Sequence, residues 1–289
     1  MCIRDRVYPG HGAGSACGKN MMKQTVDTLS NQKVVNYALN GSLTKEDFIK
    51  ELTENLPEPP TYFPSNVKLN QVGYLDLDFV LEKSLKPLNI TGFKSLTKEN
   101  KTIILDVRSQ DDFRVGYVPG SIFIGLNGGF APWAGSVIKD INTKILLVCD
   151  PGLENQAIMR LSRVGFDNVI GYLDGGFEVW KKANQKIESI DSISPIDLKE
   201  IINSEISLID VRKKNERDKG YLKVSQNIPL NIIDLKVKDL DKSIKHYVHC
   251  AGGYRSMIAC SILKRLGFDS LFDVCGGFAE IKKIGLKIH

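Results

Sequence analysis

The stretch Tyr247-Val-His-Cys-Ala-Gly-Gly-Tyr-Arg-Ser256 decides the fold. The apolar run from Ile244 to Val248 predicts a short buried strand, and the pattern from Ser256 to Leu266 predicts a helix. The tight loop between them contains a thiol, two glycines and a cation: Cys250, Gly252, Gly253 and Arg255. A strand, a glycine-rich loop and a helix N-terminus together form a cradle for an anion. We therefore expect a thiol-based site in this loop.

The same arrangement occurs a second time upstream, with a period of about 100 residues. Asp-Val-Arg stands at 106–108 and 210–212, Arg-x-Gly-Phe-Asp at 163–167 and 265–269, and Gly-Gly-Phe at 175–177 and 276–278. Each copy alternates short β-branched runs with helical patterns; in the second, strands are expected at 206–209 and 271–274. A helix at 197–202, capped by the preceding Ser194-Pro195, is expected to open the second copy. This alternation predicts an α/β fold with parallel sheets flanked by helices.

These motifs, in this order, resemble the rhodanese domain over roughly residues 90–289. The resemblance implies two tandem rhodanese-like domains and the handling of sulfane sulfur, as thiosulfate or persulfide sulfurtransfer. The partners would be a small sulfur donor and a thiol acceptor. We place the domains at residues 66–190 and 191–289, after a separate N-terminal part at 1–65.

The loop chemistry fits this resemblance. A nucleophilic thiol must be ionised near neutral pH, and both a helix N-terminus and a nearby arginine favour the thiolate of Cys250. We expect a covalent two-step cycle through a persulfide on Cys250. The residues expected to bind substrate are Ala251, Gly252, Gly253, Tyr254, Arg255 and Ser256. Arg255 would bind an anionic donor, and Tyr254 would be an exposed side chain at the mouth of the pocket.

Several neighbours have a structural interpretation beside a functional one. Cys250 itself could be a small buried apolar residue, although burial does not explain the adjacent glycines and arginine. We expect His249 to face away from Cys250 and to be structural. Asp210 and Arg212 are expected to brace the loop, and Cys260 to lie in the core. Cys275 could be a resolving thiol or a plain turn residue.

The first copy departs from the pattern at the loop Val148-Cys-Asp-Pro-Gly-Leu-Glu-Asn155. Cys149 aligns with Cys250, but Glu154 replaces Arg255 and Asp150 adds a second carboxylate. Carboxylates beside a thiol raise its pKa and repel an anionic donor, so this copy is expected to be an inactive structural or docking domain. The apolar segment Phe130–Trp133 could pack on the N-terminal part, on the second copy, or within its own core.

The segment Val7-Tyr-Pro-Gly-His-Gly-Ala-Gly-Ser-Ala-Cys-Gly18 resembles a late motif of the metallo-β-lactamase superfamily, in the glyoxalase II and persulfide dioxygenase branch. The resemblance implies a metal ligand at His11, which would stand alone, since the His-x-His-x-Asp-His motif is missing here. The alternative, which we favour, is that His11 is a surface loop residue of a truncated domain. We expect a truncated, helical remnant of that fold, with iron or zinc only if its missing portion is present. Helices are expected within 19–56, one capped by Thr44, and a linker at Leu56–Pro60.

The 289 residues are 42% hydrophobic and 25% charged, with a net charge of +5 and scattered lysines. This composition is that of an ordinary globular protein and points to no nucleic-acid or membrane partner. Six irregularly spaced cysteines indicate a reducing, cytoplasmic setting. We expect no cofactor for the sulfur transfer itself. Three other functions stay open. One is a non-enzymatic sulfur carrier or interaction module. Another is a part of a persulfide dioxygenase fusion whose metal domain is truncated here. The third is phosphatase or arsenate reductase chemistry, for which the four residues between Cys250 and Arg255 make a small loop.

Overall fold

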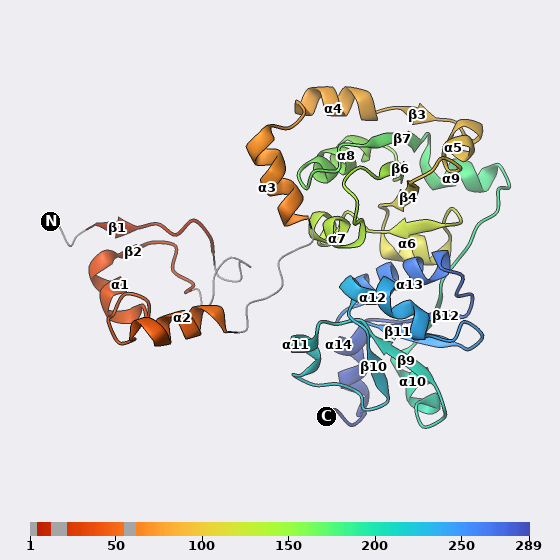
Figure 1. Ribbon diagram of the computed structural model, residues 1–289. Coiled ribbons are helices and arrows are strands. Elements are labelled where there is room, and N and C mark those ends of the chain that lie inside the picture. The colour runs from red at the N-terminus through yellow and green to blue at the C-terminus, as the bar shows by residue number, and fades with distance from the viewer. Residues whose placement is uncertain (1–4, 13–21, 55–61) are drawn as a thin grey trace. The chain divides into compact units, whose positions relative to one another are not determined.

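The computed structural model describes residues 5–12, 22–54 and 62–289 (Figure 1). The chain divides into two compact units, Met1–Pro59 and Pro60–His289, and the second unit contains both copies of the repeat. The boundaries at 65 and 190 stay predictions. Within the described ranges, no helix has both the length and the apolar character needed to cross a bilayer.

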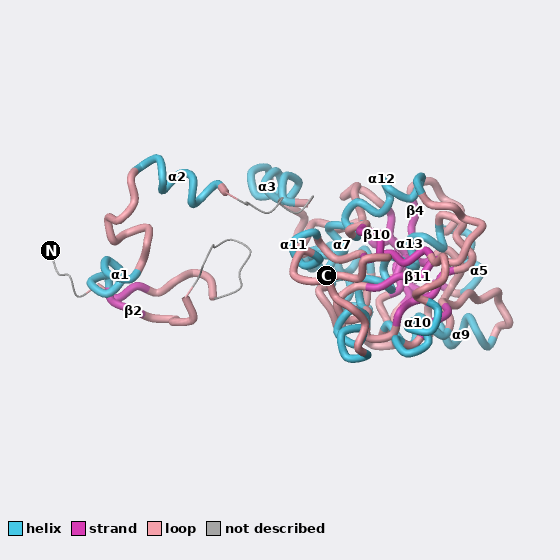
Figure 2. The backbone as a smooth tube through the Cα atoms, turned by 90° about the horizontal axis from the view of Figure 1, so that it is seen from below, coloured by secondary structure: helices cyan, strands magenta, loops and turns pink. Residues whose placement is uncertain are grey.

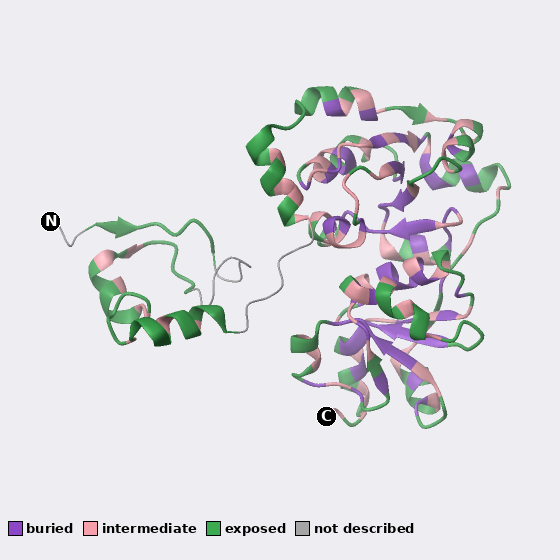
Figure 3. Ribbon diagram, viewed as in Figure 1, coloured by how far each residue is buried: buried purple, intermediate pink, exposed green. Residues whose placement is uncertain are grey.

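The N-terminal unit is small and has no interior of its own. It contains β1 (Arg6–Val7) paired antiparallel with β2 (Asp27–Thr28), then α1 (Leu29–Val35) and α2 (Lys45–Thr53). The expected helix cap is confirmed, because Thr44 Oγ1 accepts the Asp47 N–H. None of its described residues is buried (Figure 3). The expected linker at Leu56–Pro60 lies outside the described residues.

Each copy of the repeat contains one five-stranded, fully parallel sheet. In the first copy the order is β3-β7-β6-β4-β5, and in the second it is β8-β12-β11-β9-β10, which is the same topology. The first set is β3 (Pro87–Leu88), β4 (Thr102–Asp106), β5 (Ser121–Phe123), β6 (Lys144–Val148) and β7 (Val169–Leu173). The second set is β8 (Asp191–Ile193), β9 (Ser207–Asp210), β10 (Ser225–Asn227), β11 (His246–His249) and β12 (Leu271–Val274).

Helices cover both faces of each sheet, as the sequence predicted, and the strands lie inside them (Figure 2). Alternate residues face opposite sides: Leu147 packs with the helices at 130–137 and 154–162, whereas Leu146 packs with those at 90–96 and 176–182. The first copy contains α3 (Phe63–Val72), α4 (Leu77–Ser84), α5 (Ile90–Leu96), α6 (Gln110–Val115), α7 (Phe130–Val137), α8 (Glu154–Ser162) and α9 (Gly176–Lys182). The second contains α10 (Pro195–Ile201), α11 (Lys214–Arg217), α12 (Ile233–Lys236), α13 (Tyr254–Arg265) and α14 (Gly277–Ile281).

The predicted boundaries around the Cys250 loop need correction. The strand runs over His246–His249 instead of 244–248, because the exposed Ile244 lies outside the sheet. The helix begins at Tyr254, two residues before Ser256, since Gly253 at φ 103° turns the chain directly into its first turn. The strand at Leu271–Val274 is confirmed, and α10 begins after Ser194 as expected.

The two copies pack through the helix that follows the Cys250 loop. Helix α13 lies against β5 of the first copy, where the Phe123 N–H donates to Ser261 Oγ at 3.0 Å. The rings of Phe113, Tyr117 and Phe123 join the core of the second copy. Of the apolar segment at 130–133, Phe130 lies in the core of its own copy, whereas Trp133 contacts both cores.

Candidate active site

The thiol of Cys250 lies at the bottom of the loop between β11 and α13. The residue is 1% exposed, and its Sγ accepts the Gly253 N–H at 3.1 Å. The hydroxyl of Ser256 lies 3.6 Å from Sγ and donates to the Gly253 carbonyl at 2.8 Å. Gly252 is exposed, and no atom lies within 4 Å of the place where its Cβ would be. The loop is thus solvent-exposed at Gly252, whereas the Cys250 side chain is buried.

The Gly-Gly-Phe motif fixes this loop from below. The carbonyls of Cys250 and Ala251 accept the N–H groups of Phe278 and Ala279, at 2.7 and 2.9 Å. A Cβ on Gly277 would lie 2.6 Å from the Cys250 carbonyl oxygen, and Gly277 has φ +57°. Only glycine permits this close approach of two backbone segments. The same contact occurs in the first copy between Gly176 and Cys149.

Asp210 and Arg212 make the contacts of a brace, as expected. Arg212 Nε and Nη2 donate to the Asp210 carboxylate at 2.9 and 2.7 Å, and Nη2 also donates to the Gly220 carbonyl. Burial alone would raise the pKa of Asp210, but the bonds and charge of Arg212 hold that pKa below its usual value. The guanidinium lies 3.7 Å from the ring centroid of Phe278, so the brace joins the end of β9 to α14.

His249 is fully buried on the Phe278 side of the sheet, with stacked rings whose centroids are 6.0 Å apart. Burial lowers the pKa of His249 to about 4, so the imidazole is neutral at physiological pH. Cys260 is fully buried and its pKa is raised by burial, which agrees with the expected core position. Cys275 is partly exposed, with Sγ 3.9 Å from Arg114, and its resolving role stays a prediction.

Arg255 is already paired inside the protein. Its Nη1 and Nη2 donate to Glu216 Oε2 and Oε1, both at 2.6 Å, in the bidentate geometry that arginine favours. Glu216 lies on α11, and its Oε2 also accepts the Lys213 N–H at 3.1 Å. The sequence analysis missed Glu216, although its position three residues after Lys213 is typical of a helix start.

The expected exposure of Tyr254 is wrong. Its side chain lies in the first turn of α13 and is half-buried against the first copy. The hydroxyl donates to the Gly125 carbonyl at 2.7 Å, and the ring meets Phe123 edge-on at 5.7 Å between centroids. A Cβ on Gly128 would lie only 2.3 Å from this ring. Tyr254 therefore ties the loop to the neighbouring domain.

Two further residues near the loop were missed. Gln110, from α6 of the first copy, covers Gly253, because its Nε2 lies 3.3 Å from where a Cβ on that glycine would be. Asp273 on β12 is 5% exposed and lies behind Ser256. Burial raises the pKa of Asp273 to about 7, against the opposing effects of Ser256 and Arg114. Neither contact is visible in sequence spacing, since each joins distant segments.

The loop of the first copy follows the same backbone course, but a different side chain accepts its glycine N–H. The N–H of Gly152 donates to the carboxylate of Glu154, at 2.9 and 3.1 Å to its two oxygens, where the matching N–H of Gly253 meets a sulfur. Burial raises the pKa of Cys149 to about 12, with further contributions from Glu154, Asp106 and Asp150. The expected direction of this shift is confirmed, with burial as its first cause.

No metal site is assembled in the described part of the chain. His11 is exposed, and no group of three or more His, Cys, Asp or Glu side chains in the described ranges could hold a metal ion. The described residues alone therefore do not make up an iron or zinc centre at His11, and the expectation about these metals stays a prediction.

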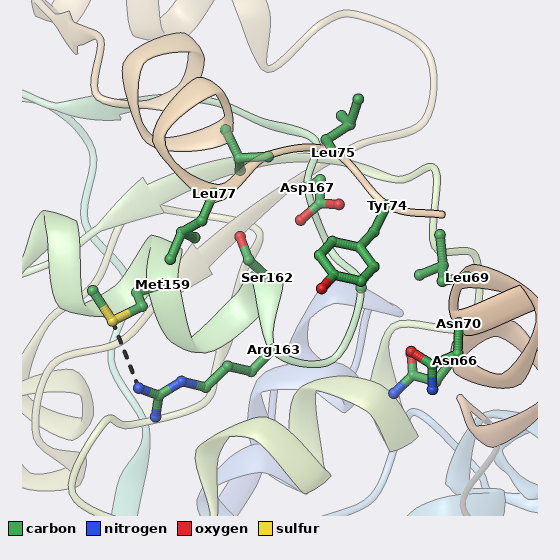
Figure 4. Close-up of a pocket in the computed structure, with 12 residues that line it drawn as sticks. Asn66, Leu69, Asn70, Tyr74, Leu75, Leu77, Met159, Ser162, Arg163 and Asp167 are labelled. Atoms are coloured by element: carbon green, nitrogen blue, oxygen red, sulfur yellow. Dashed lines mark hydrogen bonds between the residues drawn. The ribbon is translucent and has the colours of Figure 1, made fainter. Parts of the chain in front are cut away.

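A separate cavity of about 430 Å³ lies among α3, α4 and α8, on the first copy (Figure 4). Tyr74, Leu77 and Asp167 line it together with Met159 and Arg163, which contact each other at 3.6 Å. None of its lining residues is a cysteine or a histidine, so this cavity has no part in thiol chemistry.

Comparison with known proteins gives one family for both copies. The model of the rhodanese-like domain matches residues 90–183 and 194–284. Thiosulfate sulfurtransferase GlpE of Shewanella oneidensis is 31% identical over 102 residues, which cover 35% of this chain and 97% of that protein. Putative sulfur carrier protein YrkF of Bacillus subtilis is 28% identical, over 34% of this chain and 54% of its own length.

Among solved structures, a rhodanese-related protein from Thermoplasma volcanium is 34% identical, covering 34% of this chain and 97% of its own, with a TM-score of 0.32. A metallo-beta-lactamase from Staphylococcus aureus is 27% identical, covering 58% of this chain and 44% of its own, with a TM-score of 0.46.

Proposed function

The chain belongs to the rhodanese-like family, and we propose that it is a sulfurtransferase working through a persulfide on Cys250. The observation that supports this most is the Gly253 N–H bonded to Cys250 Sγ at the start of α13. A backbone donor and a helix N-terminus both stabilise negative charge on sulfur. The names of relatives, a thiosulfate sulfurtransferase and a putative sulfur carrier, support the same chemistry.

The proposed cycle has two displacements at sulfur. The Cys250 thiolate attacks the sulfane sulfur of a donor, the donor's S–S bond breaks, and sulfite or a thiolate leaves with the bonding electrons. An acceptor thiolate then attacks the terminal sulfur of the Cys250 persulfide and regenerates the Cys250 thiolate. The Gly253 N–H and the Ser256 hydroxyl contact Cys250 Sγ, and we expect them to stabilise the persulfide as well.

No step of this cycle requires a cofactor, since one sulfur atom moves between sulfur nucleophiles. We propose a cytoplasmic setting, in which the described cysteines remain free thiols. Metal analysis of the purified 289-residue chain is expected to find far less than one iron or zinc per chain. One tightly held equivalent of either metal would contradict this.

A carrier without turnover is the second candidate, and the 1% exposure of Cys250 favours it, because a covered persulfide is protected from loss. One experiment separates the two. The protein is incubated with thiosulfate or a thiol persulfide, and the mass of the Cys250 peptide is determined by mass spectrometry. Steady-state sulfur transfer to cyanide or a thiol is measured on the same preparation.

The sulfurtransferase is expected to gain the mass of one sulfur atom at Cys250 and to turn over. Persulfide without turnover identifies a carrier. No sulfur at Cys250 with either donor contradicts the proposed function.

A further inference from the structure

The contact between Arg255 and Glu216 bears on which donors the loop accepts. Arg255 is the one charged side chain in the segment from Cys250 to Ser256. Two hydrogen bonds of 2.6 Å bind both terminal nitrogens of its guanidinium to Glu216, so its positive charge is balanced within the protein. The side chain of Arg255 is 15% exposed and that of Glu216 35%, so the pair is partly shielded from solvent.

Glu216 is held in this position from its own side as well. Its Oε2 accepts the Lys213 N–H at the start of α11, and the Arg255 guanidinium keeps the pKa of Glu216 below its usual range. The carboxylate is therefore ionised at neutral pH. Freeing Arg255 for a substrate breaks two charge-assisted hydrogen bonds and leaves Glu216 without its cation beside the loop.

Known sulfane-sulfur donors differ in the charge that they bring to such a loop. Thiosulfate is a dianion and expels sulfite, another dianion. A thiol persulfide brings at most one negative charge at its reacting end and expels a thiolate. With Arg255 neutralised, the backbone N–H groups and the helix N-terminus remain to stabilise this charge beside Cys250 Sγ.

We propose that Glu216 is a specificity-determining residue, which occupies Arg255 and thereby directs the Cys250 loop toward singly charged donors, the thiol persulfides, over thiosulfate. This inference rests on the proposed sulfurtransfer at Cys250. The preferred step is attack of the Cys250 thiolate on the outer sulfur of R–S–SH, which gives Cys250–S–SH and R–S⁻ with no change in total charge. Specificity here comes from the Glu216 carboxylate, which repels a dianionic donor, as much as from attraction of the preferred donor.

Two donors that share the sulfur chemistry but differ in charge test the proposal. Thiosulfate carries two negative charges, and toluenethiosulfonate carries one, with the same sulfane sulfur bonded to an oxidised sulfur. The kcat/KM for each donor is measured for the wild-type chain and for Glu216→Gln, which removes the charge and keeps an acceptor for the Lys213 N–H. Asp218→Asn is the matched control, because Asp218 is an exposed carboxylate at the end of the same helix.

In Glu216→Gln we expect kcat/KM for thiosulfate to rise about tenfold, the size of one partly shielded unit charge, and kcat/KM for toluenethiosulfonate to change less than about threefold. Asp218→Asn is expected to leave the ratio of the two values near that of the wild type. An unchanged ratio in Glu216→Gln overturns the proposal while leaving sulfurtransfer intact. A wild-type chain inactive with both donors refutes the proposed function instead.

A binding measurement tests the same charge without turnover. In a Cys250→Ser background, thiosulfate binds but cannot react, and its Kd is measured by calorimetry with and without Glu216→Gln. We expect Kd to fall about tenfold when the charge of Glu216 is removed. Equal Kd values in the two proteins overturn the proposal, whatever the activity assays show.

Discussion

The loops at Cys149 and Cys250 share a backbone and differ in what fills it. Both follow a central strand, both rest on a Gly-Gly turn, and both lie above a buried Asp–Arg pair. In the first loop the backbone donor of Gly152 meets the carboxylate of Glu154, and in the second the donor of Gly253 meets a thiol sulfur. The difference shows that an acidic side chain in the first helical turn can accept the backbone N–H that would otherwise bind an external anion.

The largest expected contrast is in catalysis. Cys250→Ser should lower sulfurtransfer by more than about a thousandfold, because the hydroxyl is a poor nucleophile for sulfur. Cys149→Ser should keep activity within about twofold, since its cradle is filled by Glu154. Thiocyanate formation from cyanide measures the activity of both variants. Comparable losses in the two would show that the two loops do not differ in catalysis.

The reactivity of Cys149 toward iodoacetamide sharpens the same contrast. With a pKa of about 12 in place of an ordinary value of 9.0, its thiolate fraction at pH 8 is about a thousandfold smaller than that of a free thiol. The alkylation rate should climb about tenfold per pH unit from pH 8 to 11. Glu154→Gln should increase it only in part, because burial is the main cause; a plateau below pH 9 would disprove this account.

Asp273 in β12 makes the stability of the second copy depend on pH. The matching residue in β7 of the first copy is Tyr172, which has no carboxyl group. The pKa of Asp273 in the folded state, about 7, lies above the unfolded value near 3.8, so the folded protein retains the proton. Its contribution to stability is complete below about pH 4 and is lost as the pH rises toward 7, by about 4 kcal/mol.

Denaturant unfolding of Asp273→Asn, which mimics the protonated acid, should lack this loss of stability between pH 4 and 7. Parallel stability curves for the variant and the wild type would show that Asp273 is ionised throughout, contrary to the shift described above.

The smallest expected effect concerns Tyr254. Tyr254→Phe removes the hydrogen bond to Gly125 and should lower the free energy of unfolding by about 1 kcal/mol. Leu153 is the matching residue in the first copy and is exposed, so Leu153→Ala should change stability by less than about 0.5 kcal/mol. Thermal unfolding measures both, and equal shifts would remove this difference between the loops.

The sequence predicted the fold well because its signals are local and occur twice. Apolar runs, helix caps and the repeated Asp-Val-Arg and Gly-Gly-Phe motifs place the parallel sheets, and α10 after Ser194 is where the cap predicted it. The start of α13 was missed by two residues. Its first turn depends on the positive φ of Gly253, which a helical pattern alone does not reveal.

The site was predicted only as far as its own loop. Glu216, Gln110 and Asp273 reach it from three other elements, and each contact depends on how distant segments pack. Tyr254 was predicted to be exposed because a polar loop implies solvent. Its half-buried position follows from the neighbouring domain, whose packing no local pattern encodes.

The packing of α13 on β5 means that the duplication is no longer modular. Strand β5 is an edge of its sheet, and an uncovered edge invites pairing with other chains and aggregation. Helix α13, which follows the Cys250 loop, shields that edge, and its Ile262 packs against the core of the first copy. Separating the two copies would therefore expose an edge strand on one and an apolar helix face on the other, so each copy protects the other from aggregation.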